Sequence, residues 1–220
     1  DEEAHQGYAR DLFDQYASYF EASLIGLNYR APALILRALE ALLPGLAEGT
    51  ARLGPVLDLG CGTGLVGVVV HDLLAAGMVG VDLSPRMLEQ ARAKNIYTAL
   101  HLAVAAVGIE VVEHLLEAGG QRFEAILAGD VLIYVPDAAR LLRGIGRRLA
   151  PGGLAVFTCE TAPDGEDHAI SAEGRFQQSE AFLRRALAEA GLQPCIIRPE
   201  PLRLEAGAPV PGLLVAARLA

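Results

Sequence analysis

Cysteine is scarce in this 220-residue chain, and its three residues are widely separated. Cys61, Cys159 and Cys195 include no CxxC pair. An odd number of scattered cysteines is typical of reduced thiols rather than of a disulfide framework or a zinc site. We therefore expect neither redox chemistry nor a bound metal.

Basic residues are also few. The chain has 18 Lys and Arg against 27 Asp and Glu, which gives a formal net charge of −9 and a pI near 5.0. Sequence-independent affinity for nucleic acids depends mainly on clustered Lys and Arg. The only basic doublets, at 147–148 and 184–185, lie in patterns typical of solvated helix faces. Nucleic acid is therefore not expected as a partner.

No hydrophobic run approaches the ~20 residues that a membrane-spanning helix needs. His71 and Asp72 interrupt the longest candidate, and the N-terminus has no signal-peptide pattern. We expect a cytoplasmic protein that does not use a membrane as a partner.

Short apolar runs alternate with helical patterns through most of the chain. The runs are Val56–Leu59, Met78–Val81, Ile96–Ala103, Phe123–Leu127 and Leu154–Thr158. This βαβ rhythm predicts a mostly parallel sheet with helices on both faces. Two further runs, 193–199 and 212–219, predict a hairpin whose last strand is antiparallel. We expect one compact unit, with a helical lid segment at 1–50 and a seven-stranded, doubly wound, Rossmann-like α/β domain at 51–220.

Three alternating glycines follow the first predicted strand. Gly60, Gly62 and Gly64 can adopt positive φ, because glycine has no Cβ, and they let the backbone approach a ligand closely. Asp82 ends the second strand 20 residues after Gly62. An acid at this place accepts hydrogen bonds from the ribose hydroxyls of a nucleotide-like ligand. Residues 62–67 also match GxGxxG, so this loop alone leaves a dinucleotide open.

Four motifs in chain order resemble those of class I S-adenosylmethionine-dependent methyltransferases. They are VLDLGCGTG at 56–64, VGVDLSPRML at 79–88, DVLIY at 130–134 and LAPGG at 149–153. The terminal hairpin is similar to this family too, and the resemblance covers about residues 8–219. It implies methyl transfer from S-adenosylmethionine. The alternatives are a nicotinamide-dependent oxidoreductase and a cofactor-binding module that has lost catalysis.

The resemblance also implies which residues contact the cofactor. The glycines would hold the backbone against its methionine and ribose portions, Asp58 would bind its amino group, and Asp82 would bind the ribose. Leu83 and Met87 would face the adenine. The expected cofactor-binding residues are Tyr29, Asp58, Gly60, Cys61, Gly62, Gly64, Asp82, Leu83, Met87, Gly129, Asp130 and Val131.

Two positions depart from the family pattern. Many relatives have an acid after the third strand that binds the adenine amino group, whereas this chain has only apolar residues at 102–106. Gln178 stands where relatives often have His. These residues leave open how the adenine is held and whether a general base acts.

Further motifs narrow the resemblance. Residues 13–17, 27–32 and 174–179 are similar to a bacterial group of predicted methyltransferases that is often found with tetratricopeptide repeats. No such repeat occurs within these 220 residues. The resemblance therefore implies that only the catalytic module is represented here.

Methyl transfer asks for few catalytic side chains, because the protein can act by holding two reactants collinear in a dry pocket. A base is needed only where the acceptor must lose a proton. The candidates near the expected site are Asp130, Tyr134 and His168, the last in a polar loop after the fifth strand.

Aromatic residues concentrate before the sheet begins. Half of the chain's six Tyr and six Phe occur there: Tyr8, Phe13, Tyr16, Tyr19, Phe20 and Tyr29. These are more than one helix face can bury. We interpret the segment as a lid over cofactor and acceptor, with Tyr29 and Arg30 at its hinge. An aromatic lid suits a small, partly apolar acceptor.

Overall fold

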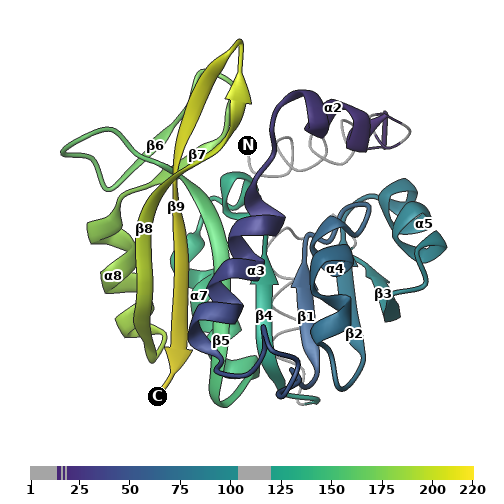
Figure 1. The fold of residues 1–220 in the computed structure, drawn as a ribbon. Coiled ribbons are helices and arrows are strands. Elements are labelled where there is room, and N and C mark those ends of the chain that lie inside the picture. The colour runs from purple at the N-terminus through teal and green to yellow at the C-terminus, as the bar shows by residue number, and fades with distance from the viewer. Residues whose placement is uncertain (1–13, 16, 18, 104–119) are drawn as a thin grey trace.

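A nine-stranded mixed sheet forms the centre of the protein in a computed structural model, which describes residues 14, 15, 17, 19–103 and 120–220 (Figure 1). The strands are β1 (Val56–Leu59), β2 (Met78–Asp82), β3 (Tyr97–Leu102), β4 (Phe123–Ala128), β5 (Leu149–Thr161), β6 (His168–Ile170), β7 (Phe176–Gln178), β8 (Leu192–Glu205) and β9 (Ala208–Leu219). The helices are α2 (Phe20–Gly26), α3 (Ala31–Leu42), α4 (Leu65–Val70), η1 (His71–Leu73), α5 (Pro85–Ala93), η2 (Leu132–Tyr134), α7 (Ala138–Arg148) and α8 (Glu180–Glu189).

The strand order confirms the predicted fold class. Strands β3, β2, β1, β4 and β5 are neighbours in that order and are all parallel. Strand β9 then pairs antiparallel with β5, and β8 pairs antiparallel with β9, as the terminal hairpin predicts. Strands β6 and β7 form a short additional pair at the end of β5, which raises the expected seven strands to nine.

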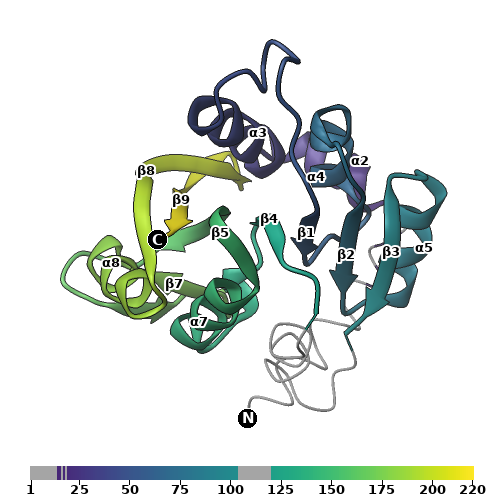
Figure 2. The same ribbon diagram turned by 90° about the horizontal axis from the view of Figure 1, so that it is seen from below.

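Helices cover both faces of the sheet (Figure 2). On one face, α3 and α4 pack with Ala125 and Leu127 of β4; on the other, α7 and α8 pack with Ile126 and Ala128 of the same strand. Alternate residues of β4 therefore enter different cores, which is the pattern of a strand buried on both sides.

Sequence signals for helix ends agree with the structure. The Ser84 hydroxyl accepts a hydrogen bond from the Met87 amide at the start of α5, and Ser179 does the same for Phe182 at the start of α8. Gly191 follows α8 with φ of +73°. Three of the six N-terminal aromatic residues, Tyr8, Phe13 and Tyr16, lie outside the described residues, as does the part of the apolar stretch that follows Ala103.

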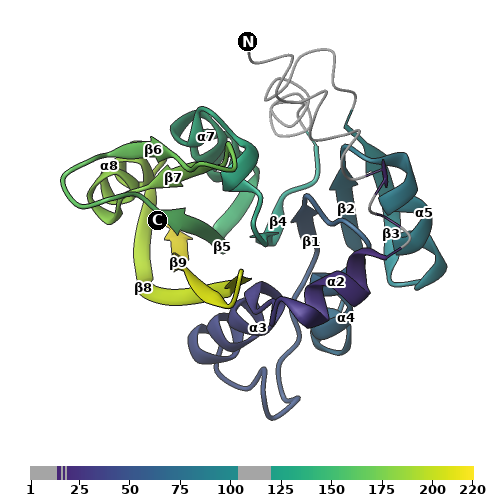
Figure 3. The same ribbon diagram turned by 90° about the horizontal axis from the view of Figure 1, so that it is seen from above.

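The carboxyl ends of the parallel strands meet at one edge of the sheet, at the top in Figure 1. Asp58 of β1 is in register with Gly80 of β2 and Leu127 of β4. The turns that follow these three strands are therefore adjacent, as Figure 3 shows from above. The residues expected to bind the cofactor lie at this edge.

Candidate active site

The loop after β1 brings bare backbone to the carboxyl edge. Gly60, Gly62 and Gly64 have φ angles of +61°, +53° and +93°, a region that favours glycine. A Cβ at Gly60 would lie 2.5 Å from Cγ2 of Val131, so this glycine also lets the turn after β4 approach. The loop is shaped for close contact with a ligand and with its neighbouring turn.

The Asp82 carboxylate fixes the loop. Its Oδ2 accepts a hydrogen bond from the Gly62 amide at 2.8 Å, and its Oδ1 accepts one from the Ser84 amide at 2.9 Å. Burial raises the pKa of Asp82, and these amides oppose that rise. Each carboxylate oxygen has two lone pairs, so both oxygens can still accept a further hydrogen bond. The arrangement is suited to a ribose with two hydroxyls.

Asp58 is fully buried at the middle of β1. The Tyr97 hydroxyl donates a hydrogen bond to its Oδ2 at 2.7 Å, whereas its Oδ1 has no partner among the described residues. Burial raises the pKa of Asp58 to about 7, Tyr97 acts in the opposite direction, and the nearby Asp82 charge adds to the rise. A buried carboxylate oxygen without a donor is a ready acceptor for a cationic amino group.

The turn after β4 is held in an uncommon conformation. Asp130 has a φ of +55°, which is rare outside glycine. Its amide donates to Thr158 Oγ1 at 2.9 Å, its Oδ1 accepts from the same hydroxyl at 2.7 Å, and its Oδ2 lies 3.0 Å from Nη1 of Arg203. Burial raises the pKa of Asp130, and Arg203 and Thr158 oppose that rise.

Tyr29 reaches this turn from the N-terminal side. Its hydroxyl would lie 3.4 Å from a Cβ added to Gly129, so the absence of a side chain at Gly129 makes room for it. Burial raises the pKa of Tyr29 well above its ordinary value, and the Asp130 charge adds to the rise. The phenol therefore stays protonated and neutral beside the turn.

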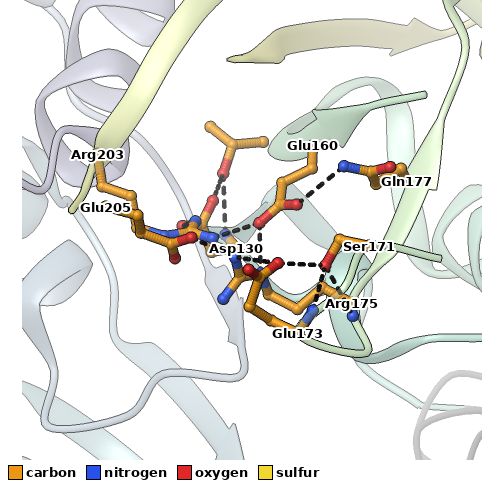
Figure 4. A network of polar contacts seen from close by, with 9 residues as sticks. Asp130, Glu160, Ser171, Glu173, Arg175, Gln177, Arg203 and Glu205 are labelled. Atoms are coloured by element: carbon orange, nitrogen blue, oxygen red, sulfur yellow. Dashed lines mark hydrogen bonds and ion pairs between the residues drawn. The ribbon is translucent and has the colours of Figure 1, made fainter. Parts of the chain in front are cut away.

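A network of ion pairs extends from Asp130 across β5 and β8 (Figure 4). The Glu160 side chain, 1% exposed, receives the Arg203 guanidinium, and its Oε1 lies 2.7 Å from Nε of Arg175. Nε of Arg203 lies 3.0 Å from Glu205, which also pairs with Arg175 at 2.6 Å. The network joins the turn after β4 to the β6–β7 pair and to β8.

The segment before α3 lies against the glycine loop and α5. Nζ of Lys94 donates to Glu21 and to the carbonyl oxygen of Thr63, both at 2.7 Å. The Phe20 ring is the nearest group to the open side of Gly62. Further back, Ser84 donates to Asp14, and Gln90 donates to the carbonyl oxygen of Ala17. The described residues of this segment therefore contact the loop and α5, and a role as a lid stays a prediction.

Three other expected cofactor residues are mainly buried. The Cys61 amide donates to the carbonyl oxygen of Val81 at 3.0 Å, and burial raises the pKa of its thiol, so backbone geometry is its visible contribution. Leu83 is partly buried against the core that includes α7 and α8. Met87 is 1% exposed on α5. Of the apolar stretch 102–106, only Leu102 and Ala103 are described.

The three candidate bases lie in different surroundings. Asp130 is engaged by Arg203 and Thr158, as described above. Tyr134 ends η2, and burial raises its pKa to about 12. His168 is not in a loop: it begins β6, pairs with Gln178 of β7, and packs its ring edge-on against Phe182 at 4.6 Å. The polar residues at 161–168 did not predict this short strand, because β6 is stabilised by pairing with β7 rather than by burial of alternate apolar residues.

Sequence reasoning did not identify Tyr97, Glu160, Arg175 or Arg203 as site residues. Arg203 gave no signal, because its place between Leu202 and Leu204 matches the apolar–polar alternation of an ordinary half-exposed strand. Its partners come from distant parts of the chain and carry no common spacing. In the part of the chain that the structure describes, no cluster of three His, Cys, Asp or Glu could hold a metal ion.

The sheet order, the glycine loop and the two strand-end acids define a Rossmann-like cofactor-binding domain. Residues 56–153 match the protein family described as "Methyltransferase domain". Over these residues the chain resembles class I S-adenosylmethionine-dependent methyltransferase domains, and this match favours that enzyme class over a nicotinamide-dependent oxidoreductase.

Curated relatives are similar over part of the chain. Methyltransferase-like protein 27 of Homo sapiens is 40% identical over 155 residues, covering 68% of this chain and 57% of that protein. The ubiquinone biosynthesis O-methyltransferase of Neisseria meningitidis is 32% identical over 105 residues, covering 47% of this chain and 42% of the relative. The chain thus spans about half the length of these relatives.

A solved structure shares the whole fold. Magnesium protoporphyrin IX methyltransferase from Synechocystis, with bound SAH, superimposes with a TM-score of 0.68 at 15% identity, covering 98% of this chain and all of that one (100%). No helix among the described residues has the length and apolar character needed to span a membrane.

Proposed function

We propose that this chain transfers the methyl group of S-adenosylmethionine to a small-molecule acceptor by in-line displacement of sulfur. One observation carries the proposal: Asp58 of β1 and Asp82 at the end of β2 lie on either side of the glycine loop, and Asp58 Oδ1 has no hydrogen-bond partner among the described residues. Such a site combines three features within one small volume. They are backbone without side chains, a carboxylate that accepts hydrogen bonds from ribose hydroxyls, and a carboxylate that accepts one from an ammonium group.

Each part of the cofactor has a residue that fits it. The two Asp82 oxygens would accept the ribose hydroxyls while still holding the loop, and Asp58 Oδ1 would accept the amino group. Backbone at Gly60 and Gly62 would line the ribose and methionine portions. The turn at 129–131 would border the sulfur. Leu83 and Met87 would contact the adenine.

The protein's contribution to methyl transfer would be positioning and exclusion of water. S-adenosylmethionine supplies a methyl group on a positively charged sulfur, which is readily displaced by a nucleophile. The residues of the chain would fix the turn after β4, cover the loop with Phe20, and place the neutral Tyr29 hydroxyl beside Gly129. Holding reactants collinear in this way can supply much of the required rate.

A dedicated base is not required by this arrangement. Asp130 is held by Arg203 and Thr158, so we assign it to shaping the turn rather than to accepting a proton. Tyr134 has a high pKa, and His168 packs against Phe182 on β6. The acceptor would therefore be a nucleophile that is already ionised or loses its proton to water.

The small-molecule class rests on two supports. The N-terminal segment of the described chain packs closely on the loop and on α5, which suits an acceptor that can be enclosed. The Neisseria relative is named for ubiquinone biosynthesis, and the Synechocystis enzyme for magnesium protoporphyrin IX. The finer resemblance, to methyltransferases found with tetratricopeptide repeats, stays a prediction that rests on residues 13–17, 27–32 and 174–179.

Calorimetry with S-adenosylmethionine and, separately, with NADH tests the cofactor. We expect only S-adenosylmethionine to bind, and we expect Asp82→Ala to abolish binding. Asp72→Ala is the matched control, because that carboxylate is 87% exposed in a pair with His71. Binding of NADH alone would refute the proposal.

An acceptor panel of phenols, carboxylic acids and heterocyclic amines, read by mass spectrometry of the products, tests the transfer. We expect methylation of at least one class. Tight cofactor binding with no product from any class would favour the degenerate module.

A further inference from the structure

The guanidinium of Arg203 is surrounded by three carboxylates (Figure 4). Its Nη1 lies 3.0 Å from Asp130, its Nε lies 3.0 Å from Glu205, and its Nη2 pairs with Glu160. The side chain is 7% exposed. All three guanidinium nitrogens therefore have acidic partners, a planar fork that an ammonium cannot reproduce.

The backbone on either side of Arg203 holds the hinge of the N-terminal segment. The Arg30 amide donates to the carbonyl oxygen of Leu202 at 2.9 Å, and the Leu204 amide donates to the carbonyl oxygen of Leu27 at 2.6 Å. Nη1 of Arg30 adds a bond to the carbonyl oxygen of Pro201 at 3.1 Å. Residues 27–30 are thus docked on the backbone of β8, directly at Arg203.

The other end of the same side chain holds the turn after β4. Asp130 keeps its positive φ while Thr158 binds its amide and one oxygen, and Arg203 binds the other oxygen. The next residue, Val131, packs against Gly60 of the loop. One residue of β8 is therefore in contact with both the hinge and the turn that borders the glycine loop.

We propose that Arg203 is a positioning residue that couples docking of the hinge at 27–30 to the conformation of the turn at 129–131. The hinge aligns β8, β8 places the guanidinium, and the guanidinium sets Asp130 and hence the wall of the cofactor site. The inference rests on the proposed function in assigning that wall to the cofactor, while the coupling itself is a property of the folded chain.

Arg203→Lys tests the coupling, because it keeps the charge but loses the fork. We expect amide hydrogen exchange to quicken at Arg30 and Leu204, while the Val156 amide in the central sheet keeps its protection. Affinity for S-adenosylhomocysteine should fall on the order of tenfold, within the usual range for coupled sites. Arg184→Lys is the matched control: its exposed pair with Glu180 lies on α8, and both readouts should stay unchanged.

Asp130→Asn is the second test variant. It leaves Arg203 paired with Glu160 and Glu205, so the coupling can still be tested if Arg203→Lys does not fold. We expect Asp130→Asn also to quicken exchange at Arg30, although Asp130 does not bond the hinge. The double variant should show less than the sum of the single effects, because both changes break one link.

Unchanged exchange at Arg30 and Leu204 in both single variants would overturn the inference. So would uniform quickening that includes Val156, since that reports global loss of stability. If the wild-type chain binds neither S-adenosylmethionine nor S-adenosylhomocysteine, the proposed function fails, and the exchange data still decide the coupling.

Discussion

The carboxyl edge of the sheet has two halves that are built by different means. The glycine-loop half lies at the ends of β1 and β2. It consists of the backbone of the glycine loop and of two acids, Asp58 and Asp82, that are close to this loop in the sequence. The ion-pair half, at the ends of β4, β5 and β8, consists of charged side chains contributed from distant positions. Conformational freedom of glycine shapes the first, whereas mutual neutralisation of buried charges shapes the second.

The largest effect is expected in the ion-pair half. Glu160→Gln removes the most deeply buried carboxylate beside Arg203 and Arg175, which keep Asp130 and Glu205 as close acidic partners. We expect a loss of about 3 kcal/mol in the free energy of unfolding, the lower end of the range for breaking a buried pair. Urea denaturation measures it. Glu180→Gln is the control, because its exposed pair with Arg184 should contribute about 0.5 kcal/mol or less. Equal losses from Glu160→Gln and Glu180→Gln would contradict this prediction, because burial would then not strengthen the ion pairs in this half of the edge.

The next effect concerns the glycine-loop half. Gly60→Ala adds a Cβ at positive φ and 2.5 Å from Val131, so we expect about 3 kcal/mol of combined strain and overlap. Cofactor affinity, measured by calorimetry, should be lost at accessible concentrations. Gly152→Ala carries a similar φ of +74° but meets no atom within 4 Å, so it isolates the cost of the backbone conformation. If the two variants bind alike, contact with the neighbouring turn is unimportant.

The smallest effect on cofactor affinity depends on pH. Because burial raises the pKa of Asp58 to about 7, the folded chain holds a proton that the unfolded chain releases near pH 4. The stability contributed by this group therefore falls as the pH rises from about 4 to about 7. Affinity for the cationic cofactor should rise as the pH passes through about 7, when the carboxylate ionises.

Asp58→Asn should remove both pH dependences and weaken cofactor binding by about 2 kcal/mol, the loss of one charge-assisted hydrogen bond. Thermal melts and calorimetry across this pH range measure the two effects. A wild-type affinity that is flat with pH would show that the Asp58 carboxylate does not bind the amino group.

The same contrast explains what could be predicted from the sequence. The core strands, the terminal hairpin and the strand-end positions of Asp58 and Asp82 follow from hydrophobic runs and glycine spacing, which act locally along the chain. The roles of these residues toward the cofactor stay predictions. Ion pairs obey no such local rule, because Arg203 meets Asp130 across 73 positions.

Strands β6 and β7 were missed for a related reason. They are three residues each, only Gln178 among their six residues is buried, and they owe their form to backbone pairing with one another and with the end of β5. Periodicity reports side-chain burial, so a strand without a buried face leaves little trace in a single sequence. The expected loop at His168 is wrong for this reason.

The docking of residue 30 on residues 201–202 also has a consequence for synthesis on the ribosome. The contact joins positions 171 apart. Since chains emerge from the N-terminus at about 5–20 residues per second, the glycine loop and β2 can form several seconds before β8 is available. Residues 27–30 must then wait for their docking strand, while Asp14, Ala17 and Glu21 can already contact α5 and the residues that flank it. A chaperone that shields nascent aromatic segments would find its target here, and slowing translation after β5 would lengthen that wait.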